Sequence, residues 1–201
     1  MDLAGIQKAL TEQGIDAWLL YDFRGSNPIA RSVIGFDEHQ IGTRRWFYLI
    51  PAQGEPVAIL HVIEPNALKG AAGKSVLYRS WKELEGLLKS HLAGMKRVAM
   101  EYSAGAAIPY VGRVDAGTVE MVKAAGPQVV SSADLVQFFE ARWTPDQKDL
   151  HDRAARGCVA AKDAAFELIR ERLKAGAKVT ESEVQAFIMR RFEEQGLFSH
   201  H

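Results

Sequence analysis

The strongest constraint on the fold is a change of pattern near residue 142. Before it, short apolar segments typical of strands alternate with amphipathic segments typical of helices. After it, two amphipathic helices follow each other, and no strand-like segment remains to cover them. The alternation predicts an α/β fold for residues 1–142. Residues 143–201 are expected to form a helical segment whose apolar faces need a cover.

Aromatic and β-branched residues mark the expected strands, which are "IDAWLLYD", "WFYLIP", "VAILHV", "SVLYRS", "KRVAMEY" and the "QVV" segment. The linker "AQGEP" between the second and the third predicts a hairpin. A hairpin pairs antiparallel, whereas strands joined by a helix usually pair parallel, so we expect a mixed β-sheet flanked by helices. Residues 23–45 form a long connection rich in Gly, Ser and Asn, with a helical turn expected at residues 27–33.

Capping residues predict where several helices begin. Ser80 should cap one helix, and Ser132 or Ser131 should cap the last helix before residue 142. Thr144 followed by proline should open a long helix. Thr180, with glutamate three residues later, forms a capping box for the next helix. The apolar positions expected on the last two helices are Leu150, Ala154, Cys158, Ala165, Ile169 and Leu173, then Val184, Phe187, Ile188 and Phe192.

Composition excludes several classes of protein. Lys plus Arg number 25 and Asp plus Glu number 25, so no basic surplus indicates a nucleic-acid partner. The single cysteine, Cys158, excludes a disulfide within the chain and a Cys2His2 zinc site, and its place on an apolar helix face predicts a buried thiol. The N-terminal residues lack the pattern of a signal peptide, and no apolar run reaches membrane-spanning length. We therefore expect a cytoplasmic protein without a membrane or nucleic-acid partner.

Common catalytic motifs are missing from the sequence. "KGAAGKS" has the Gly-Lys-Ser end of a phosphate-binding loop, but Leu68 stands where the first glycine belongs and a strand pattern follows. No histidine pair has metal-ligand spacing, and no G-x-S-x-G elbow is present. We therefore predict neither a nucleotide site nor a serine-hydrolase site.

The stretch "FDEHQIGTRRW" has the highest local concentration of charged and ionisable side chains that could bind a ligand. It brings Asp37, Glu38, His39, Arg44 and Arg45 into one connection before a strand. Loops held by a rigid sheet often carry binding groups, and arginine suits the recognition of carboxylates. The alternative is a solvated loop without a binding role.

Several phrases, taken in order, resemble the N-terminal part of the creatinase / prolidase / Xaa-Pro aminopeptidase family of pita-bread metallopeptidases. They are "YDFRGSNPIARSVIGF", "TRRWFYLIPAQGEPVAILHVIEP", "MEYSAGAAIPYVGRVDAGTVEMVKAAG" and "VVSSADLVQFFEARWTPDQKDLHDRAA". The resemblance covers essentially the whole chain. It lies in the order of the phrases, and the "WTPDQ" joint leading into the "KVTESEV" helix is the most telling.

The resemblance implies a creatinase-type N-terminal domain at residues 1–142. Residues 143–201 would be the opening helices of an incomplete catalytic domain. In that family two aspartates, one histidine and two glutamates further along the chain hold two divalent metal ions (Mn, Co or Zn). No such ligand is assigned here, so we expect this chain to be inactive alone and to be a piece of a longer peptide-hydrolysing protein. His39, Arg44 and Arg45 become candidates for the rim of the substrate cleft.

Two other interpretations stay open. The longer protein could be a creatinase-like C–N hydrolase that uses the same scaffold without metals, since fold alone does not fix chemistry. The chain could also be a natural non-catalytic module that oligomerises. Exposed apolar helix faces drive association, so a homo-oligomer through the N-terminal domain or through the last two helices is expected.

Overall fold

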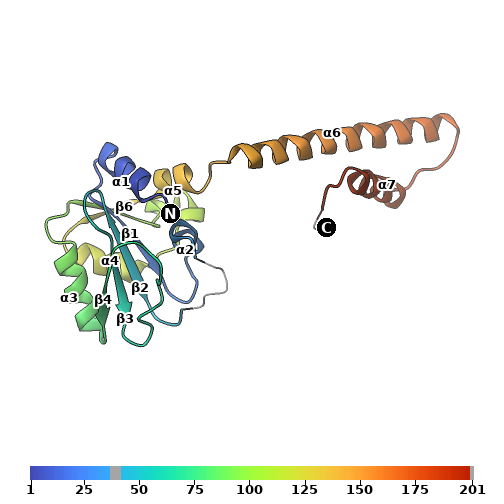
Figure 1. Ribbon diagram of the computed structural model, residues 1–201. Helices are drawn as coiled ribbons and strands as arrows, with labels where there is room; N and C mark the ends of the chain where they lie inside the picture. The colour runs from blue at the N-terminus through green and yellow to red at the C-terminus, as the bar shows by residue number, and fades with distance from the viewer. Residues whose placement is uncertain (37–41, 200–201) are drawn as a thin grey trace. The chain divides into compact units, whose positions relative to one another are not determined.

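The computed structural model describes residues 1–36 and 42–199. The chain divides into two compact units, Met1–Arg142 and Trp143–His201, which are described separately below. The ribbon in Figure 1 shows a sheet with helices in the first unit and two helices in the second. Within the described residues, no helix has both the length and the apolar content that a membrane crossing needs.

The first unit is built on a mixed sheet of six strands in the described part of the chain, in the order β4-β3-β2-β1-β5-β6. β1 pairs antiparallel with β2, and β2 pairs antiparallel with β3. The pairs β3–β4, β1–β5 and β5–β6 are parallel. The predicted hairpin and the mixed sheet are therefore confirmed. The strands are β1 (Ala17–Asp22), β2 (Trp46–Pro51), β3 (Val57–His61), β4 (Lys74–Tyr78), β5 (Arg97–Met100) and β6 (Gln128–Ser131).

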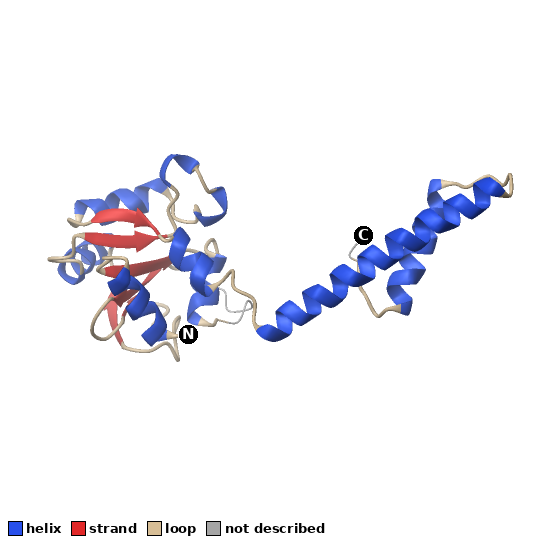
Figure 2. Cartoon of the chain, turned by 90° about the horizontal axis from the view of Figure 1, so that it is seen from above, coloured by secondary structure: helices blue, strands red, loops and turns tan. Residues whose placement is uncertain are grey.

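Helices cover both faces of this sheet, as Figure 2 shows. On one face, α3 (Trp81–His91) and α4 (Ala116–Ala124) contribute side chains to one buried apolar cluster. On the other, α1 (Leu3–Glu12), α2 (Pro28–Ile34) and α5 (Ala133–Phe139) contribute to a second cluster. The unit is thus a three-layer α/β/α domain with one core on each side of the sheet.

The central strand β1 shows why the sheet needs both helical layers. Leu19 and Tyr21 point into the cluster beneath α3 and α4, whereas Trp18 and Leu20 point into the cluster beneath α1, α2 and α5. All six residues of β1 are buried. A strand that is buried on both faces is typical of the centre of an α/β sheet.

Local capping explains where the helices of the first unit begin. The side chain of Asn27 accepts from the Ala30 N–H at the start of α2, and Ser80 caps α3 in the same way, as predicted. The prediction for α5 is confirmed only in part. Ser132 occupies the N-cap position without a side-chain cap, because its hydroxyl is used elsewhere, and Ser131 Oγ accepts from the Ala133 N–H.

The second unit consists of α6 (Pro145–Lys174) and α7 (Glu181–Glu194). Both begin with a capping box, formed by Thr144 with Gln147 and by Thr180 with Glu183. Each box satisfies two backbone N–H groups that the first helical turn leaves unbonded. The predicted helices and their starting residues are confirmed.

Contact between these two helices buries very little. The fully buried positions of α6 are the small residues Gly157, Ala161 and Ala165, and no residue of α7 is fully buried. The prediction of a buried Cys158 thiol is wrong, because this cysteine is exposed. The amphipathic pattern identified an apolar face correctly, but nothing in the described chain covers it at Cys158.

Candidate functional site

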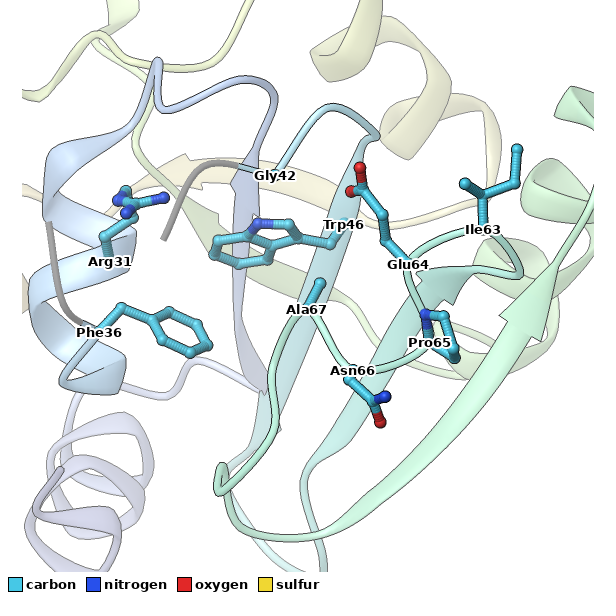
Figure 3. Close-up of a pocket in the computed structure, with 9 residues that line it drawn as sticks. All are labelled: Arg31, Phe36, Gly42, Trp46, Ile63, Glu64, Pro65, Asn66 and Ala67. Atoms are coloured by element: carbon cyan, nitrogen blue, oxygen red, sulfur yellow. The ribbon is translucent and has the colours of Figure 1, made fainter. Parts of the chain in front are cut away.

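A cavity of about 330 Å³ lies in the first unit beside the start of β2. It sits between α2 and the turn that follows β3, and Figure 3 shows the side chains around it. Two of its lining residues, Phe36 and Trp46, are the first and last residues of the "FDEHQIGTRRW" stretch. The lining residues are Arg31, Phe36, Gly42, Trp46, Ile63, Glu64, Pro65, Asn66 and Ala67.

Two aromatic rings form the apolar wall of this cavity. Phe36 and Trp46 meet edge to face, with ring centroids 6.4 Å apart and an interplanar angle of 64°. Trp46 is buried, and Phe36 is partly buried. An edge-to-face aromatic pair adds to the stability that apolar burial alone provides. It therefore ties the end of the α2 segment to the first residue of β2.

Glu64, on the opposite side of the cavity, binds the residues just before β2. Its carboxylate accepts the Thr43 N–H at 2.9 and 3.1 Å, the Thr43 hydroxyl at 2.5 Å and the Arg44 N–H at 3.1 Å. Partial burial raises the pKa of Glu64, but these hydrogen bonds and the nearby Arg44 charge outweigh it, so the pKa lies below its usual value. A carboxylate that is bonded in this way fixes the backbone just before β2.

Two of the three predicted rim residues, Arg44 and Arg45, lie in this segment before β2. The Arg44 side chain is exposed, while Arg45 is partly buried and its carbonyl accepts the Tyr78 hydroxyl at 2.7 Å. Burial raises the pKa of Tyr78, and the charges of Arg45 and Arg44 oppose that rise. His39 lies outside the described residues. Arg44 and Arg45 thus stand side by side on an anchored segment, and their role stays a prediction.

Arg31 links the cavity to the interior of the domain. Its guanidinium lies 3.9 Å from the carboxylate of Asp22, which is buried at the end of β1. Asp22 also accepts the backbone N–H groups of Gly25 and Asn27, at 3.1 and 2.8 Å. These bonds hold the turn between β1 and α2 in one conformation, and they fix where α2 presents Arg31.

A buried polar network lies next to this turn. Glu101, directly after β5, accepts the Trp18 indole N–H at 2.6 Å, the Asn27 side-chain N–H at 2.7 Å and the Ser132 hydroxyl at 3.1 Å. Asn27 also donates to the Tyr21 carbonyl at 2.8 Å. Glu101, Asn27 and Ser132 are all 0% exposed. One carboxyl group therefore joins β1, α2, β5 and the start of α5.

Burial governs the protonation of Glu101. Complete desolvation raises the pKa of its carboxyl group, and the hydrogen bonds from Trp18, Asn27 and Ser132 oppose that rise. The group lies at the carboxyl end of the parallel strands β1, β5 and β6, where open α/β sheets often place binding sites. Here that position is filled by protein groups that satisfy one another, so the network is structural.

Sequence analysis did not single out Glu64, Asp22 or Glu101. Glu64 sits in a turn with no regular spacing, and its partners come from a segment about twenty residues away. For Glu101 the sequence contains one indication, which is its position directly after the apolar strand "VAM". A carboxyl group that is buried there needs hydrogen-bond partners. Sequence alone does not identify those partners.

The described residues do not fit a metal centre. Within residues 1–36 and 42–199, no three His, Cys, Asp or Glu side chains are grouped closely enough to hold a metal ion. The "KGAAGKS" segment does not fit a phosphate loop either, because strand β4 begins at Lys74 where a helix would have to start. No catalytic step is therefore assigned to this chain.

Comparison with known proteins identifies the fold. No protein-family model matches the sequence, and no curated protein matches it. Among solved structures, a dipeptidase from Pyrococcus horikoshii matches 96% of this chain and 50% of its own, with a TM-score of 0.55 and 16% identity. An X-Pro aminopeptidase from Thermotoga maritima matches 96% of this chain and 49% of its own, with a TM-score of 0.52 and 17% identity.

A shorter structure matches about two thirds of this chain. The creatinase/prolidase N-terminal domain of an X-Pro dipeptidase from Streptococcus pyogenes covers 68% of this chain and 96% of its own length, with a TM-score of 0.51 and 17% identity. The α/β/α unit thus has the fold of the creatinase/prolidase N-terminal domain. The resemblance stated from the sequence is confirmed at the level of the fold.

The two kinds of match differ in length. The chain spans about half the length of the longer prolidase, dipeptidase and aminopeptidase structures that it matches. It spans nearly the whole length of two structures described as N-terminal domains of Xaa-Pro dipeptidases, which match 68% and 69% of this chain. The match to the longer structures therefore takes in a part of this chain that the match to the shorter domains leaves out.

Proposed function

We propose that this chain is the N-terminal region of a metal-dependent Xaa-Pro peptidase and that it is inactive alone. The observation that carries the proposal is the pattern of coverage, in which 96% of the chain aligns with about half of an X-Pro aminopeptidase and of a dipeptidase. The two divalent metal ions and the peptide-cleaving groups would belong to the part of the longer protein that this chain does not contain.

The anchored loop gives the first unit a role in that protein. Glu64 holds the backbone of Thr43 and Arg44, and the Phe36–Trp46 pair holds the start of β2. A fixed backbone lowers the cost of ordering the segment when its arginine side chains bind a carboxylate. The proposed role of Arg44 and Arg45 is to bind the carboxylate of a peptide substrate at the rim of the cleft.

The first test is the intact mass of the native gene product, compared with the 22.2 kDa of this chain. We expect a product about twice as long, in keeping with the half-length matches. Such a product should hydrolyse Xaa-Pro dipeptides with added manganese, cobalt or zinc, and chelation should abolish the activity. The 201-residue chain assayed in the same way should show no turnover.

Two outcomes would overturn this proposal. A native product of 22.2 kDa would leave no room for a catalytic half. Metal-independent hydrolysis of creatine by the longer product would instead favour the creatinase-like alternative. The loop is tested separately in the longer protein. Arg44→Ala should raise KM for a dipeptide with little effect on kcat, whereas Lys89→Ala, at an exposed position of α3, should leave KM unchanged.

A further inference from the structure

His61, the last residue of β3, shapes the turn that follows this strand. Its carbonyl accepts the Glu64 N–H at 2.9 Å, which closes a turn over residues 61–64. Inside the same turn, its imidazole Nδ1 accepts the Ile63 N–H at 3.1 Å. Figure 3 shows Ile63 and Glu64 at the cavity of the candidate site, so His61 sets the backbone of one cavity wall.

The two ring nitrogens of His61 have different partners. Nδ1 faces a backbone donor, whereas Nε2 lies 3.3 Å from the carbonyl oxygen of Arg79, which can only accept. A ring that accepts at Nδ1 and donates at Nε2 is a neutral imidazole with its proton on Nε2. The hydrogen bonds therefore select one protonation state and one tautomer of His61.

Neighbours in the sheet hold the ring in this orientation. His61 pairs with Tyr78 across the β3–β4 ladder, and the two rings meet edge to face with centroids 5.0 Å apart and an interplanar angle of 87°. The Tyr78 hydroxyl is itself bonded to the Arg45 carbonyl. The packed ring keeps Nδ1 directed at the Ile63 N–H, so a change at Nδ1 acts on the turn.

The turn that His61 shapes carries the anchor of the segment before β2. Glu64, three residues after His61, accepts the N–H groups of Thr43 and Arg44. A shift of the turn backbone moves Glu64 and stretches these bonds. His61 therefore acts on Arg44 through Glu64, as a positioning residue and not as a group that touches a ligand.

We propose that neutral His61 positions the Arg44 segment and that a proton on Nδ1 releases it. Protonated histidine carries an N–H group at both ring nitrogens. Nδ1–H would then point at the Ile63 N–H, and two donors form no hydrogen bond. Histidine ordinarily changes its charge between pH 5 and 8, so the turn is held at pH 8 and loosened at pH 5.

The ionisable groups near His61 do not replace the bond that is lost. They come from β4, from α3, from the segment before β2 and from the turn itself, and they are Tyr78, Arg79, Glu83, Arg44, Arg45 and Glu64. The arginines repel a positive charge on the ring. Both carboxylates already accept backbone N–H groups. A proton on Nδ1 therefore weakens the turn.

Nuclear magnetic resonance of the 201-residue chain tests this proposal. At pH 8 the ring nitrogens of His61 should show the tautomer with the proton on Nε2. Between pH 8 and pH 5, the hydrogen-exchange protection factors of the Ile63 and Thr43 amides should fall about three- to tenfold, the equivalent of one hydrogen bond. Glu64 stays ionised in this range, because its pKa is lowered from 4.5.

Two variants separate the acceptor from the proton. His61→Asn supplies a side-chain oxygen that accepts the N–H two residues on and does not titrate, so protection at Ile63 and Thr43 should stay high at both pH values. His61→Phe keeps a ring against Tyr78 but removes the acceptor, so protection should be low at both. His91→Gln, in the last turn of α3, is the control and should keep the pH dependence of the unchanged chain.

Four results would overturn the proposal. The first is a His61 ring with its proton on Nδ1 at pH 8. The second is equal protection of both amides at pH 8 and pH 5. The third is a pH dependence that persists in His61→Asn, which assigns it to another group. The fourth is a response at Ile63 without one at Thr43, which confines His61 to its own turn. The measurements use neither substrate nor metal, so their outcome is separate from that of the proposed peptidase function.

Discussion

Removal of the Glu101 carboxyl group should destabilise the first unit more than any other single truncation at a charged residue. In Glu101→Ala, the Trp18 indole N–H and one Asn27 amide N–H lose their only acceptor while staying fully buried. Each buried donor left without a partner costs about 1–3 kcal/mol. Ser132 also loses its partner, but its hydroxyl can rotate.

The opposing effect is smaller. Replacing Glu101 also removes the cost of keeping a carboxyl group away from water, which offsets part of the loss. We therefore expect the free energy of unfolding to fall by about 3–5 kcal/mol, a large share of the 5–15 kcal/mol that is typical of a domain. At about 3 °C per kcal/mol for a domain of this size, Tm should fall by roughly 10–15 °C.

Urea unfolding followed by tryptophan fluorescence measures this change. Trp18 and Trp46 are buried in the first unit, so their emission reports on its unfolding. Glu101→Gln should cost less, about 1–3 kcal/mol, because the amide keeps one acceptor oxygen and sets its N–H group against a donor. Glu85→Ala, at an exposed position on α3, is the control and should stay within about 0.5 kcal/mol.

A loss below about 1 kcal/mol in Glu101→Ala would refute this reasoning, since it would mean that water replaces the missing carboxylate. The pH dependence provides a second check. Because the folded pKa of Glu101 is raised above 4.5, the folded state binds the proton more tightly than the unfolded state does. Its contribution to stability is therefore full below pH 4.5 and is lost as the pH rises through the folded pKa. This slope should be absent from Glu101→Gln.

Three further changes test local features. Gly73→Ala should destabilise by more than about 1 kcal/mol, because φ is +91° and the new Cβ would lie 2.1 Å from a backbone oxygen. Gly70→Ala, with φ +93° and open space around it, carries the same strain without the clash and should cost less in the same urea titration. Thr144→Ala removes a helix cap and should lower the stability of α6 by about 1 kcal/mol, measured by circular dichroism. Glu64→Gln should speed hydrogen exchange at the Thr43 amide. In the unchanged chain, the lowered pKa means that this protection is present above pH 4.5 and is lost as the pH falls through the folded pKa.

Much of the first unit was predictable because local and tertiary preferences agree there. The hydrophobic pattern of "WFYLIP" and "VAILHV" with the short linker between them predicted the β2–β3 hairpin. Ser80 caps the helix that its position predicted, and a helix was also expected at residues 27–33, where α2 lies. These features depend on neighbours close in the sequence, so a single chain is enough to infer them.

The candidate site was only half predictable for the opposite reason. The loop that carries Arg44 and Arg45 stood out by composition, but its anchor Glu64 depends on a contact across twenty residues. Ser132 illustrates the same limit, because the local pattern predicted a cap, whereas its hydroxyl donates to the carboxyl group of Glu101, which follows β5. When a buried carboxyl group needs hydrogen-bond partners, this requirement outweighs a local capping preference worth about 1 kcal/mol.

The error at Cys158 shows what helical periodicity can and cannot establish. The spacing of apolar residues on α6 identifies its apolar face, and residues of that face from Leu150 to Ile169 line the hollows between α6 and α7. Periodicity does not report the origin of the covering surface, which can be the same chain, a second copy or a longer protein. A thiol on such a face is therefore buried or reactive according to the assembly. The reactivity of Cys158 thus measures the one property of the second unit that its sequence leaves open.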